Sequence, residues 1–429
     1  MAQPHISMGA LLSFDDTRVR LKPRPAGYEI PDLGDGSPVI PSKYRLNAAA
    51  GADDLENVYD FTLGAVGSFG LENLRVGVAV ALPMNRLGRQ ASHFGDEREQ
   101  YASYRLGFEL LGERSQHQVI LVGVGYRVLP WLSAGAAMSV MPRGTAVSSV
   151  YLADATQQKN VQIAVNNDQL GQAEPIFGIT AQPTPRLRLG LSYRAANWFG
   201  LNLENRIQIK GFQGDASAFP VVQRVNMALN YSPAQLALGL AGQWQNLTLS
   251  IDAAYSRWSR YVDTQGHPVG EHSDTSAAGQ GFSDVVSVRG GVEYQVGSDR
   301  KVRGGLAWEP SPVPAQVGRT NYVDNDRLVA TAGASHNLDL LGKPVEVAWH
   351  VGVHHLSARD TNKAALASYP LCADGVTELC DELADDAKDP ATGLTTPAAA
   401  GLQTGNPGFP GWTSSGMILT LGMDLRWAF

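Results

Sequence analysis

The chain has 429 residues, a net charge of -7 at pH 7 and 17% charged residues, against about 25% in an average soluble domain. An acidic chain without a basic stripe is not suited to nucleic acid, and no run of about 18 apolar residues supplies a membrane-spanning helix. Because no linker or break in composition divides the sequence, we expect one domain over residues 1–429.

Segments in which apolar and polar residues alternate recur along the whole chain. A period of two is the pattern of β-strands with one apolar and one polar face, and turn residues separate the segments. The predicted strands are residues 5–21, 60–69, 74–82, 120–128, 132–141, 174–182, 187–193, 219–244, 247–261, 283–296, 301–309, 327–336, 344–358 and 417–429. Their number, fourteen, is even, as a single-chain bacterial barrel requires.

Three stretches between these strands are harder to assign. Residues 219–244 change phase near Pro233, and we interpret them as one long strand with a bulge or bend at that proline. The polar stretch after residue 141 is expected to be a long loop. A short amphipathic helix is predicted from four apolar residues at helical spacing: Tyr101, Tyr104, Phe108 and Leu111.

The last strand is the most regular. Apolar residues occupy every odd position of 417–429, which is longer than the roughly 9 to 11 residues with which a tilted strand crosses a bilayer. Trp427 and Phe429 fit the aromatic girdle of a membrane interface, although an edge strand of a soluble sandwich is the alternative for this segment alone. The sequence therefore predicts an all-β fold, a 14-stranded antiparallel transmembrane β-barrel in a bacterial outer membrane, with membrane lipid around it.

The connections give the orientation of this barrel. Short turns alternate with long loops, and in such proteins the short turns face the periplasm. Residues 359–413 are accordingly expected to form a long extracellular loop.

Charged residues fall on the face of the strands that is predicted to line the lumen. The simpler interpretation is a hydrated lumen in which opposite charges pair across neighbouring strands. The sharper hypothesis is that an unpaired arginine, first of all Arg289, holds a substrate carboxylate, although Glu293 on the same face could neutralise it. The inward positions are Arg75, Arg127, Arg188, Arg194, Asp252, Arg289, Glu293, Arg303, Glu346, His350, Asp424 and Arg426.

Motifs of catalysis are missing from the sequence. It has no Gly-x-Ser-x-Gly elbow, no phosphate-binding loop and no His-Glu-x-x-His helix. The acidic residues of 381–389 could bind Ca²⁺, but a solvated loop is the simpler explanation. We therefore expect no enzyme, no cofactor and no bound metal.

Several segments together resemble the FadL family of outer-membrane transporters for long-chain fatty acids and other hydrophobic compounds. They occur in the order of the family and span most of the chain. The resembling segments are GVGYRVLPWLS (123–133), PTPRLRLGLSY (183–193), SPAQLALG (232–239), YSRWSRY (255–261), DVVSVRGGVEY (284–294), SPVP (311–314) and DNDR (324–327).

The resemblance implies a fourteen-stranded barrel that takes a hydrophobic ligand from its extracellular loops into an apolar pocket and releases it laterally or inward. Pro83 would mark the bend of the third strand, where the family is thought to open its wall. Phe429 would be read by the barrel assembly machinery. The apolar loop face that first meets the ligand would consist of Tyr101, Tyr104, Phe108 and Leu111.

The start of the chain departs from the family. Its members carry an N-terminal hatch with an Asn-Pro-Ala motif before the first strand. Here the first strand begins by His5, no Asn-Pro-Ala occurs, and residues 1–5 have no features of a signal peptide. The sequence therefore leads us to expect a chain without the hatch, truncated or mis-started, with a more open lumen.

A passive transporter of hydrophobic compounds is the leading hypothesis for the function. A general or solute-specific porin is the first alternative, and a structural or adhesive barrel whose loops bind a partner is the second. A hydrated porin would conduct ions in planar bilayers, whereas a plugged transporter would conduct little.

Cys372 and Cys380 are the only cysteines, eight residues apart in a polar stretch rich in Asp, Gly and Pro. This spacing suits a loop disulfide in an oxidising compartment, with unpaired thiols as the alternative. We expect mass spectrometry of a non-reducing digest to find a peptide in which Cys372 is linked to Cys380. Free thiols at both positions would contradict the disulfide.

Overall fold

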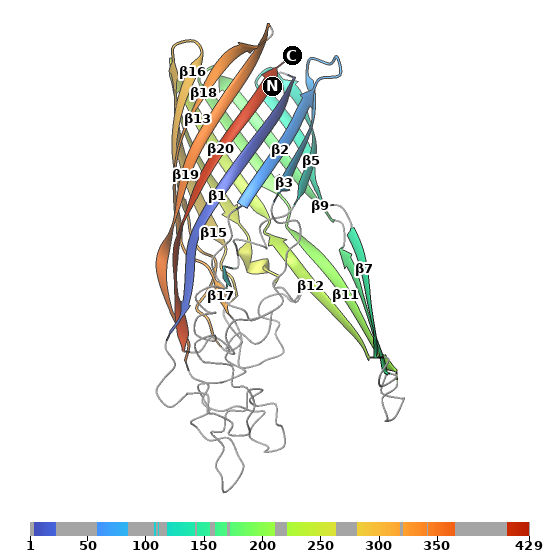
Figure 1. Ribbon diagram of the computed structural model, residues 1–429. Coiled ribbons are helices and arrows are strands. Elements are labelled where there is room, and N and C mark those ends of the chain that lie inside the picture. Colours follow the sequence, from blue (N-terminus) through green and yellow to red (C-terminus); the bar gives the residue numbers. More distant parts are fainter. Residues whose placement is uncertain are drawn as a thin grey trace.

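A computed structural model shows the chain as a closed barrel with a smaller sheet extending from one end (Figure 1). The structure describes residues 4–22, 58–84, 107–108, 110, 118–141, 144–154, 159–169, 172–210, 221–262, 281–317, 321–340, 342–364 and 410–428. Fourteen antiparallel strands form the barrel, which confirms the fold class predicted from the sequence. In these ranges no helix is long and apolar enough to cross a membrane.

The barrel strands follow one another around the wall in chain order. They are β1 (His5–Leu21), β2 (Val58–Gly67), β3 (Leu74–Pro83), β5 (Val119–Leu129), β6 (Leu132–Met141), β9 (Gln172–Thr184), β10 (Leu187–Arg194), β13 (Gln235–Trp244), β14 (Leu247–Ser256), β15 (Val285–Val296), β16 (Arg300–Glu309), β18 (Arg327–Leu340), β19 (Lys343–Asn362) and β20 (Gly411–Ala428).

The first and last strands close the wall. β1 is antiparallel to β20 along its whole length, from His5 opposite Ala428 to Leu21 opposite Trp412. In hydrocarbon an open edge would leave backbone N–H and C=O groups without partners, so closure is a condition for a sheet to span a membrane.

Large apolar side chains recur at alternate positions along the strands on the outside of the wall. On β13, for example, Leu236, Leu238 and Leu240 are all exposed. A continuous apolar surface of this kind is matched to lipid rather than water.

Exposed aromatic residues lie close to the two ends of the strands, as membrane interfaces require. Near the short turns they are Tyr126, Trp131, Trp244, Tyr294 and Trp427. Near the opposite ends they are Tyr59, Tyr193, Tyr255 and Trp308.

Six short turns, residues 68–73, 130–131, 185–186, 245–246, 297–299 and 341–342, lie at the same end of the barrel as both termini (Figure 1). Gly70 and Gly297 have φ angles of +75° and +67°, a conformation that glycine adopts without strain. At their other ends the barrel strands are joined by longer connections. Since short turns face the periplasm in such barrels, the long connections are extracellular.

Most predicted strands coincide with barrel strands. Residues 5–21 and 132–141 are β1 and β6 without any change of bounds. The predicted strand 247–261 ends earlier, at Ser256, and a short 3₁₀ helix, η5 (Trp258–Arg260), follows it. At the end of the chain, β19 continues to Asn362 and β20 begins at Gly411, so both ends of the range 359–413 are strand.

The prediction of one strand over residues 219–244 is wrong. The chain forms β12 (Val221–Ser232) and β13, which belong to different sheets and are separated at Pro233 and Ala234. Proline has no N–H to continue a ladder, which interrupts the strand at Pro233. The change of phase comes from a one-residue bulge in β12, opposite Phe199 and Gly200. The barrel still has fourteen strands because β12 lies outside its wall.

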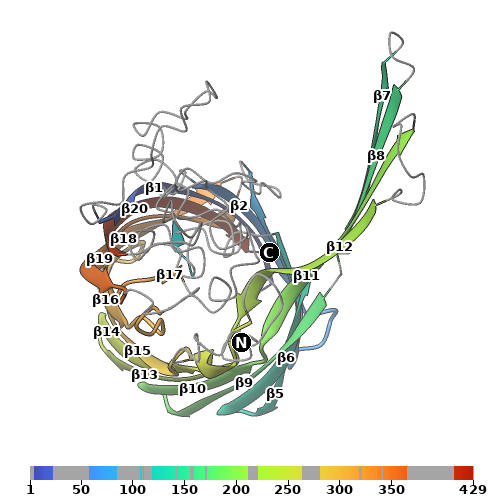
Figure 2. The same cartoon turned by 90° about the horizontal axis from the view of Figure 1, so that it is seen from below.

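The prediction of a long loop after residue 141 is also wrong. A second sheet, of order β12-β11-β8-β7, contains β7 (Gly144–Asp154), β8 (Lys159–Gln169) and β11 (Asn197–Lys210). It extends beyond the extracellular end of the barrel and reaches outside the barrel's outline in the view from below (Figure 2). Polar residues such as Ser148 and Asn167 weaken the alternation and conceal these strands in the sequence.

The helix predicted near residues 101–111 is not found where the structure describes this stretch. Gly107 and Phe108 instead form β4 (Gly107–Phe108), which pairs in parallel with β17 (Tyr322–Val323).

Closure can be tested at Gly416 of β20. A Cβ atom there would lie 2.7 Å from Thr17 Cα and 3.0 Å from the Asp16 carbonyl oxygen on β1. Because overpacking costs about 1–3 kcal/mol, Gly416→Val should lower the temperature at which the folded barrel loses its faster migration in SDS gels. Gly67→Val is the matched control, since nothing lies within 4 Å of a Cβ at Gly67. An equal loss in both variants would contradict the prediction.

Candidate functional site

Five aromatic residues meet at the extracellular end of the barrel, and we call them the aromatic cluster: Tyr231, Trp258, Tyr261, Phe282 and Tyr322. Tyr261 and Phe282 are 1% and 3% exposed and stack with ring centroids 4.1 Å apart. Tyr231 stands edge-on to Tyr261 and Tyr322 edge-on to Phe282, each at 5.3 Å. These are the stacked and edge-to-face arrangements that aromatic pairs prefer. The cluster therefore forms a compact apolar core.

Segments far apart in the sequence contribute to this cluster. Tyr231 comes from the end of β12, Trp258 from η5, and Tyr322 from β17. Burial raises the pKa of the Tyr231 hydroxyl to about 12, so it stays neutral at physiological pH.

β17 belongs to the inward segment, by which we mean residues 310–326 between β16 and β18. Figure 2 shows β17 within the ring of barrel strands. Arg359 of β19 clamps this segment: its Nη2 donates to the carbonyl oxygens of Val313 at 2.9 Å and Pro314 at 3.2 Å, and its Nη1 donates to that of Asp324 at 3.0 Å. One guanidinium thus joins both ends of the inward segment to the wall.

Asn325 attaches the same segment to the last two strands. It is 3% exposed, and its side-chain amide donates to the carbonyl oxygens of Ser357 on β19 and Ser414 on β20. The Ser414 hydroxyl donates back to the Asn325 side-chain oxygen at 2.8 Å. A buried amide with this many partners has one strongly preferred position.

A second apolar core lies beside this attachment and consists of Val19, Val323, Leu356, Trp412 and Ile418. The Nζ atom of Lys363 lies 5.8 Å from the centre of the Trp412 ring and 3.0 Å from Asn321 Oδ1. Burial lowers the pKa of this lysine to about 7. This core and the aromatic cluster both lie at the extracellular end of the barrel.

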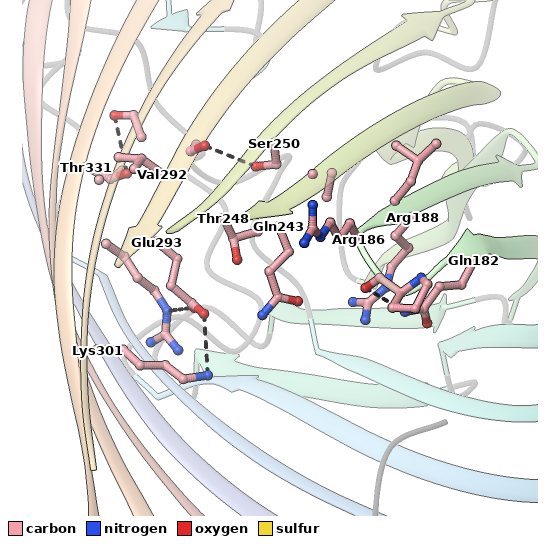
Figure 3. A pocket seen from close by; sticks show the side chains of 18 residues that line it. Gln182, Arg186, Arg188, Gln243, Thr248, Ser250, Val292, Glu293, Lys301 and Thr331 are labelled. Atoms are coloured by element: carbon pink, nitrogen blue, oxygen red, sulfur yellow. Dashed lines mark hydrogen bonds and ion pairs between the residues drawn. The ribbon is translucent and has the colours of Figure 1, made fainter. Parts of the chain in front are cut away.

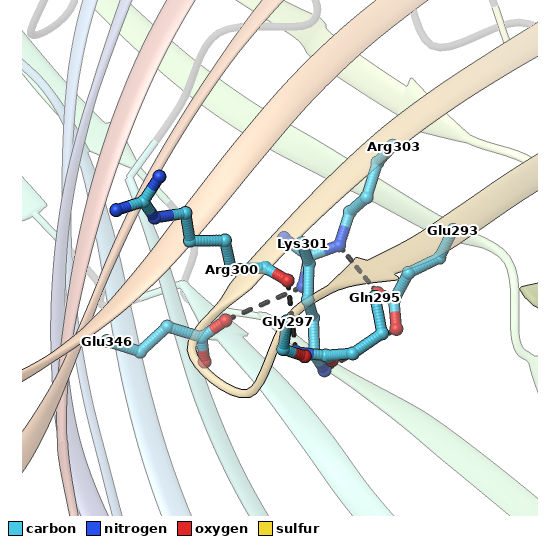
Figure 4. Close-up of polar contacts among 7 residues, drawn as sticks. All are labelled: Glu293, Gln295, Gly297, Arg300, Lys301, Arg303 and Glu346. Carbon is cyan, nitrogen blue, oxygen red and sulfur yellow. Dashed lines mark hydrogen bonds and ion pairs between the residues drawn. The ribbon is translucent and has the colours of Figure 1, made fainter. Parts of the chain in front are cut away.

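Ion pairs cross the lumen wall nearer the periplasm (Figure 4). Glu293 and Arg303 face each other on β15 and β16, with Arg303 Nε 2.7 Å from Glu293 Oε2. Arg303 Nη2 also lies 3.5 Å from Glu346 Oε1, and Lys301 Nζ lies 3.4 Å from Glu293 Oε1. The predicted pairing of lumenal charges across strands is confirmed at these residues.

Arg289 has a different partner from the one expected. Its Nη2 lies 2.9 Å from Glu309 Oε1, and Glu309 also pairs with Arg327 at 2.6 Å. Arg289 is therefore not the unpaired arginine of the hypothesis, and Glu293, which could have neutralised it, is held by Arg303 and Lys301 instead. A substrate carboxylate at Arg289 would have to compete with Glu309, and its role there stays a prediction.

A cavity of about 640 Å³ opens into the lumen close to the periplasmic turns (Figure 3). Its walls come from β9, β10 and the turn between them, and from β13, β14, β15, β16 and β18. Polar side chains dominate the lining, among them Gln182, Gln243, Thr248 and Ser250.

The charge of this cavity is positive. Arg186, Arg188, Lys301 and Arg303 line it, against the single carboxylate of Glu293. Lys301 and Arg303 are paired with that carboxylate, whereas within the described ranges no ion pair engages Arg186 or Arg188. Two unpaired guanidinium groups in one cavity are suited to bind a carboxylate or another oxyanion.

The residues predicted as sites are only partly described. Tyr101, Tyr104, Leu111, Cys372, Cys380 and Phe429 lie outside the described residues. Phe108 belongs to β4, beside the β17 strand that carries Tyr322. Pro83 is the last residue of β3.

Sequence reasoning missed Arg186 and the aromatic cluster. Arg186 sits in a turn, to which strand parity does not apply, although its neighbour Arg188 was assigned to the lumen. Trp258 and Tyr261 lie in the segment YSRWSRY, which we used only as a sign of family resemblance. No group of three or more His, Cys, Asp or Glu arranged to hold a metal ion occurs among the described residues.

A closed lipid-facing barrel with packed apolar cores at its extracellular end and a charged lumenal cavity defines an outer-membrane channel or transporter. The comparisons with known proteins identify its family. The chain belongs to the outer membrane protein transport proteins of the OMPP1/FadL/TodX type, whose sequence model matches residues 111–370.

Two relatives with assigned roles match shorter stretches. The alkane uptake protein A of Marinobacter nauticus is 28% identical over 137 residues, which are 30% of this chain and 30% of that protein. The long-chain fatty acid transport protein of Escherichia coli is 26% identical over 160 residues, 33% of this chain and 35% of that protein. The matches thus span about a third of the length of these relatives.

Solved structures share the fold over the whole chain. A FadL homologue of Pseudomonas aeruginosa aligns with a TM-score of 0.55 and 12% identity, covering 100% of this chain and 91% of the other. A TodX deltaS2S3 mutant monoaromatic hydrocarbon channel aligns with a TM-score of 0.50 and 11% identity, covering 100% and 91%.

The attachment of the inward segment should depend on pH through Asp324. Burial raises the pKa of this carboxyl from its ordinary 3.8 to about 6. Because the Asp324 carboxyl binds its proton more tightly in the folded than in the unfolded protein, protonation stabilises the folded state. This contribution to the free energy of unfolding is complete below the ordinary pKa and is lost as the pH rises through about 6. We expect the unfolding midpoint, followed by circular dichroism, to fall between about pH 4.5 and 7 by more than in Asp324→Asn. The same pH dependence in both proteins would contradict this assignment.

Proposed function

We propose that the chain carries long-chain fatty acids or related hydrophobic compounds passively across the outer membrane, with a transport role and no catalytic one. The carrying observation is the lumenal cavity with its unpaired Arg186 and Arg188, below an aromatic core at the extracellular mouth. An amphipathic ligand needs both kinds of surface, one for its chain and one for its headgroup.

The aromatic cluster supports the apolar part of this proposal. It lies where a ligand arriving from outside would first meet the barrel. Tyr101, Tyr104, Phe108 and Leu111 stay predicted as the loop face that delivers the ligand. The pairing of Phe108 with Val323, next to Tyr322 of the cluster, supports a path from that loop to the aromatic core.

The cationic cavity supports recognition of the headgroup. Guanidinium groups bind carboxylates through two parallel hydrogen bonds, and Arg186 and Arg188 lie close to the periplasmic turns. A fatty acid whose chain leaves the aromatic core could therefore be held at its carboxylate before release. An uncharged hydrocarbon would pass the same cavity without this contact.

Pro83 supports a lateral exit through the wall. Met84 donates its N–H to the Tyr59 carbonyl oxygen on β2. Since successive residues of a strand direct their backbone groups to opposite neighbours, the backbone nitrogen of residue 83 is directed toward β5. Proline has no N–H, so it cannot donate a hydrogen bond to β5 there. In the described residues β3 pairs with β5 only from Leu74 to Ala81. We propose that the wall opens here, between β3 and β5.

We also propose that the barrel assembly machinery reads the end of β20. Trp427 is exposed on its lipid face, and the terminal Phe429 has the same parity. Both continue the apolar alternation of that strand.

A porin is the second candidate, favoured by the polar lining of the same cavity. Gln182, Gln243, Thr248 and Ser250 would hydrate well. Ion conductance in planar bilayers separates the two functions: a steady open conductance supports the porin, and little or no conductance supports the transporter.

The double variant Arg186→Ala/Arg188→Ala should weaken oleate binding to the purified barrel roughly tenfold or more, because a hydrogen bond to a charged group contributes about 1.5–3 kcal/mol. Methyl oleate has no carboxylate and should bind the variant and the parent protein equally. Uptake of radiolabelled oleate by a transport-deficient strain should fall with the binding.

Arg300→Ala is the matched control, because Arg300 lies at the nearby turn, is exposed and pairs with Asp299 outside the cavity. Arg289→Ala tests the arginine predicted from the sequence and should act less strongly, since Glu309 already occupies it. Equal losses for oleate and its methyl ester would refute the carboxylate site. Failure of the exported parent protein to restore uptake would remove the fatty-acid function.

A further inference from the structure

The second sheet is a continuation of four neighbouring barrel strands. β6 is followed by β7 in the chain, and β8 is followed by β9. Met141 of β6 pairs with Gln172 of β9. Gly144 of β7, three residues after Met141, pairs with Gln169 of β8, three residues before Gln172. The ladder therefore keeps one register across the interruption, with no residue gained or lost.

The two other ladders continue in the same way. Arg194 pairs with Gln235 in the barrel, and Asn197 pairs with Ser232 in the second sheet, again three residues on and three back. Arg194 also pairs with Ile176, and Leu201 pairs with Gln169, seven residues on and seven back. Strands β6, β9, β10 and β13 thus continue as β7, β8, β11 and β12, in the same order.

An unbroken register keeps each side of the sheet the same from barrel to extension. Residues two apart along a strand share a face, so Val150 of β7 lies on the face of the lipid-facing Met138 of β6. On the next strand, Ile163 lies on the face of the lipid-facing Phe177. β12 has one extra residue in a bulge opposite Phe199 and Gly200. Beyond the bulge Leu201 pairs with Met227, so the odd-numbered residues of β12 share a face with the odd-numbered residues of β11.

The continued lipid side is mostly apolar in the extension, and the uncharged polar residues Ser148, Asn167, Asn205 and Gln223 interrupt it. We call it the outer face; its apolar residues are Val150, Leu152, Val161, Ile163, Val165, Leu201, Leu203, Ile207, Ile209, Val221, Val225 and Met227. Its only charged residues are Asp154 and Lys159, which lie opposite each other in the β7–β8 ladder at the tip of the sheet.

The continued lumenal side is polar. Apart from that pair at the tip, every charged residue of the paired strands lies on this side: Asp168, Glu204, Arg206, Lys210 and Arg224. The sheet is therefore amphipathic, with the same polarity as the membrane wall.

The extension lies beyond the part of the barrel that crosses the bilayer. β6 and β9 have 10 and 13 residues, which already reach the roughly 9 to 11 that a tilted strand needs. Figure 1 shows the second sheet leaning away from the barrel axis, and Figure 2 shows it outside the ring of barrel strands. A sheet that leans outward from the wall turns its outer face toward the surrounding membrane.

We propose that the sheet β12-β11-β8-β7 lies on the outer leaflet and sets its outer face into the lipid surface. The register makes that face continuous with the lipid-facing wall, and the overhang places it above lipid. Insertion of an apolar face into the boundary between headgroups and acyl chains is the way amphipathic elements bind membranes without crossing them. This surface is separate from the lumen and does not depend on the proposed substrate.

The test uses nitroxide labels at two neighbouring positions of β7, Val150→Cys on the outer face and Ser149→Cys on the opposite face. Both are made in full-length protein carrying Cys372→Ser and Cys380→Ser, and the barrel is reconstituted in vesicles of phosphatidylethanolamine and phosphatidylglycerol. Collisions with oxygen, which concentrates in lipid, are compared with collisions with a water-soluble nickel chelate. Heat-modifiable migration verifies that each labelled barrel is folded.

We expect the label at position 150 to favour oxygen over the nickel chelate several-fold and the label at 149 to show the reverse. The difference should vanish when the protein is moved from vesicles into a detergent solution with short micelles. Equal access of the nickel chelate to both labels in vesicles would overturn the proposal. Spin–spin broadening at position 150 would overturn it as well, because a second copy would then cover the outer face.

Discussion

Backbone hydrogen bonding in lipid is the constraint on which the rest of this structure depends. A strand inside hydrocarbon has no water to satisfy its N–H and C=O groups, so every wall strand must be paired on both sides. The pairing of β1 with β20 over its whole length meets this condition. The same pairing fixes the parity of each strand, and parity in turn assigns leucines and valines to lipid and arginines and glutamates to the lumen. Parity thus places Arg188, Glu293, Lys301 and Arg303 of the cavity on the lumenal side, whereas Arg186 reaches the cavity from a turn.

The lumen divides into two chemically different halves. Toward the outside, aromatic rings and a buried lysine and asparagine pack the inward segment against the wall. Toward the periplasm, ion pairs between β15, β16 and β19 leave Arg186 and Arg188 without an acidic partner in the described structure. This arrangement of an apolar core and a cationic cavity is the basis for the proposed path of molecules with a long chain and an acidic head.

Strict alternation made the barrel strands predictable, and its failures have physical causes. In the wall, one face meets lipid throughout, so apolar residues are needed at every second position. In β7 and β8 that requirement is weaker, and Ser148 and Asn167 break the pattern. Pro233 was interpreted as a bend because one long strand over residues 219–244 kept the number of barrel strands even. The strand is interrupted there, and the number of barrel strands is still even because β12 belongs to the second sheet. The aromatic cluster was out of reach, since its members come from four segments whose meeting depends on loop paths rather than on periodicity.

The attachment of the inward segment has a consequence for the order of assembly. Asn325 is held by carbonyl oxygens of Ser357 and Ser414, which belong to the last two strands of the barrel. This seat does not exist until the C-terminal hairpin has formed, and β20 is also the strand that seals the wall against β1. Sealing of the wall and completion of the Asn325 attachment therefore both require β20. A chain without its final strand would therefore have an open seam along β1 and would also lose the contacts of Asn325 with Ser414.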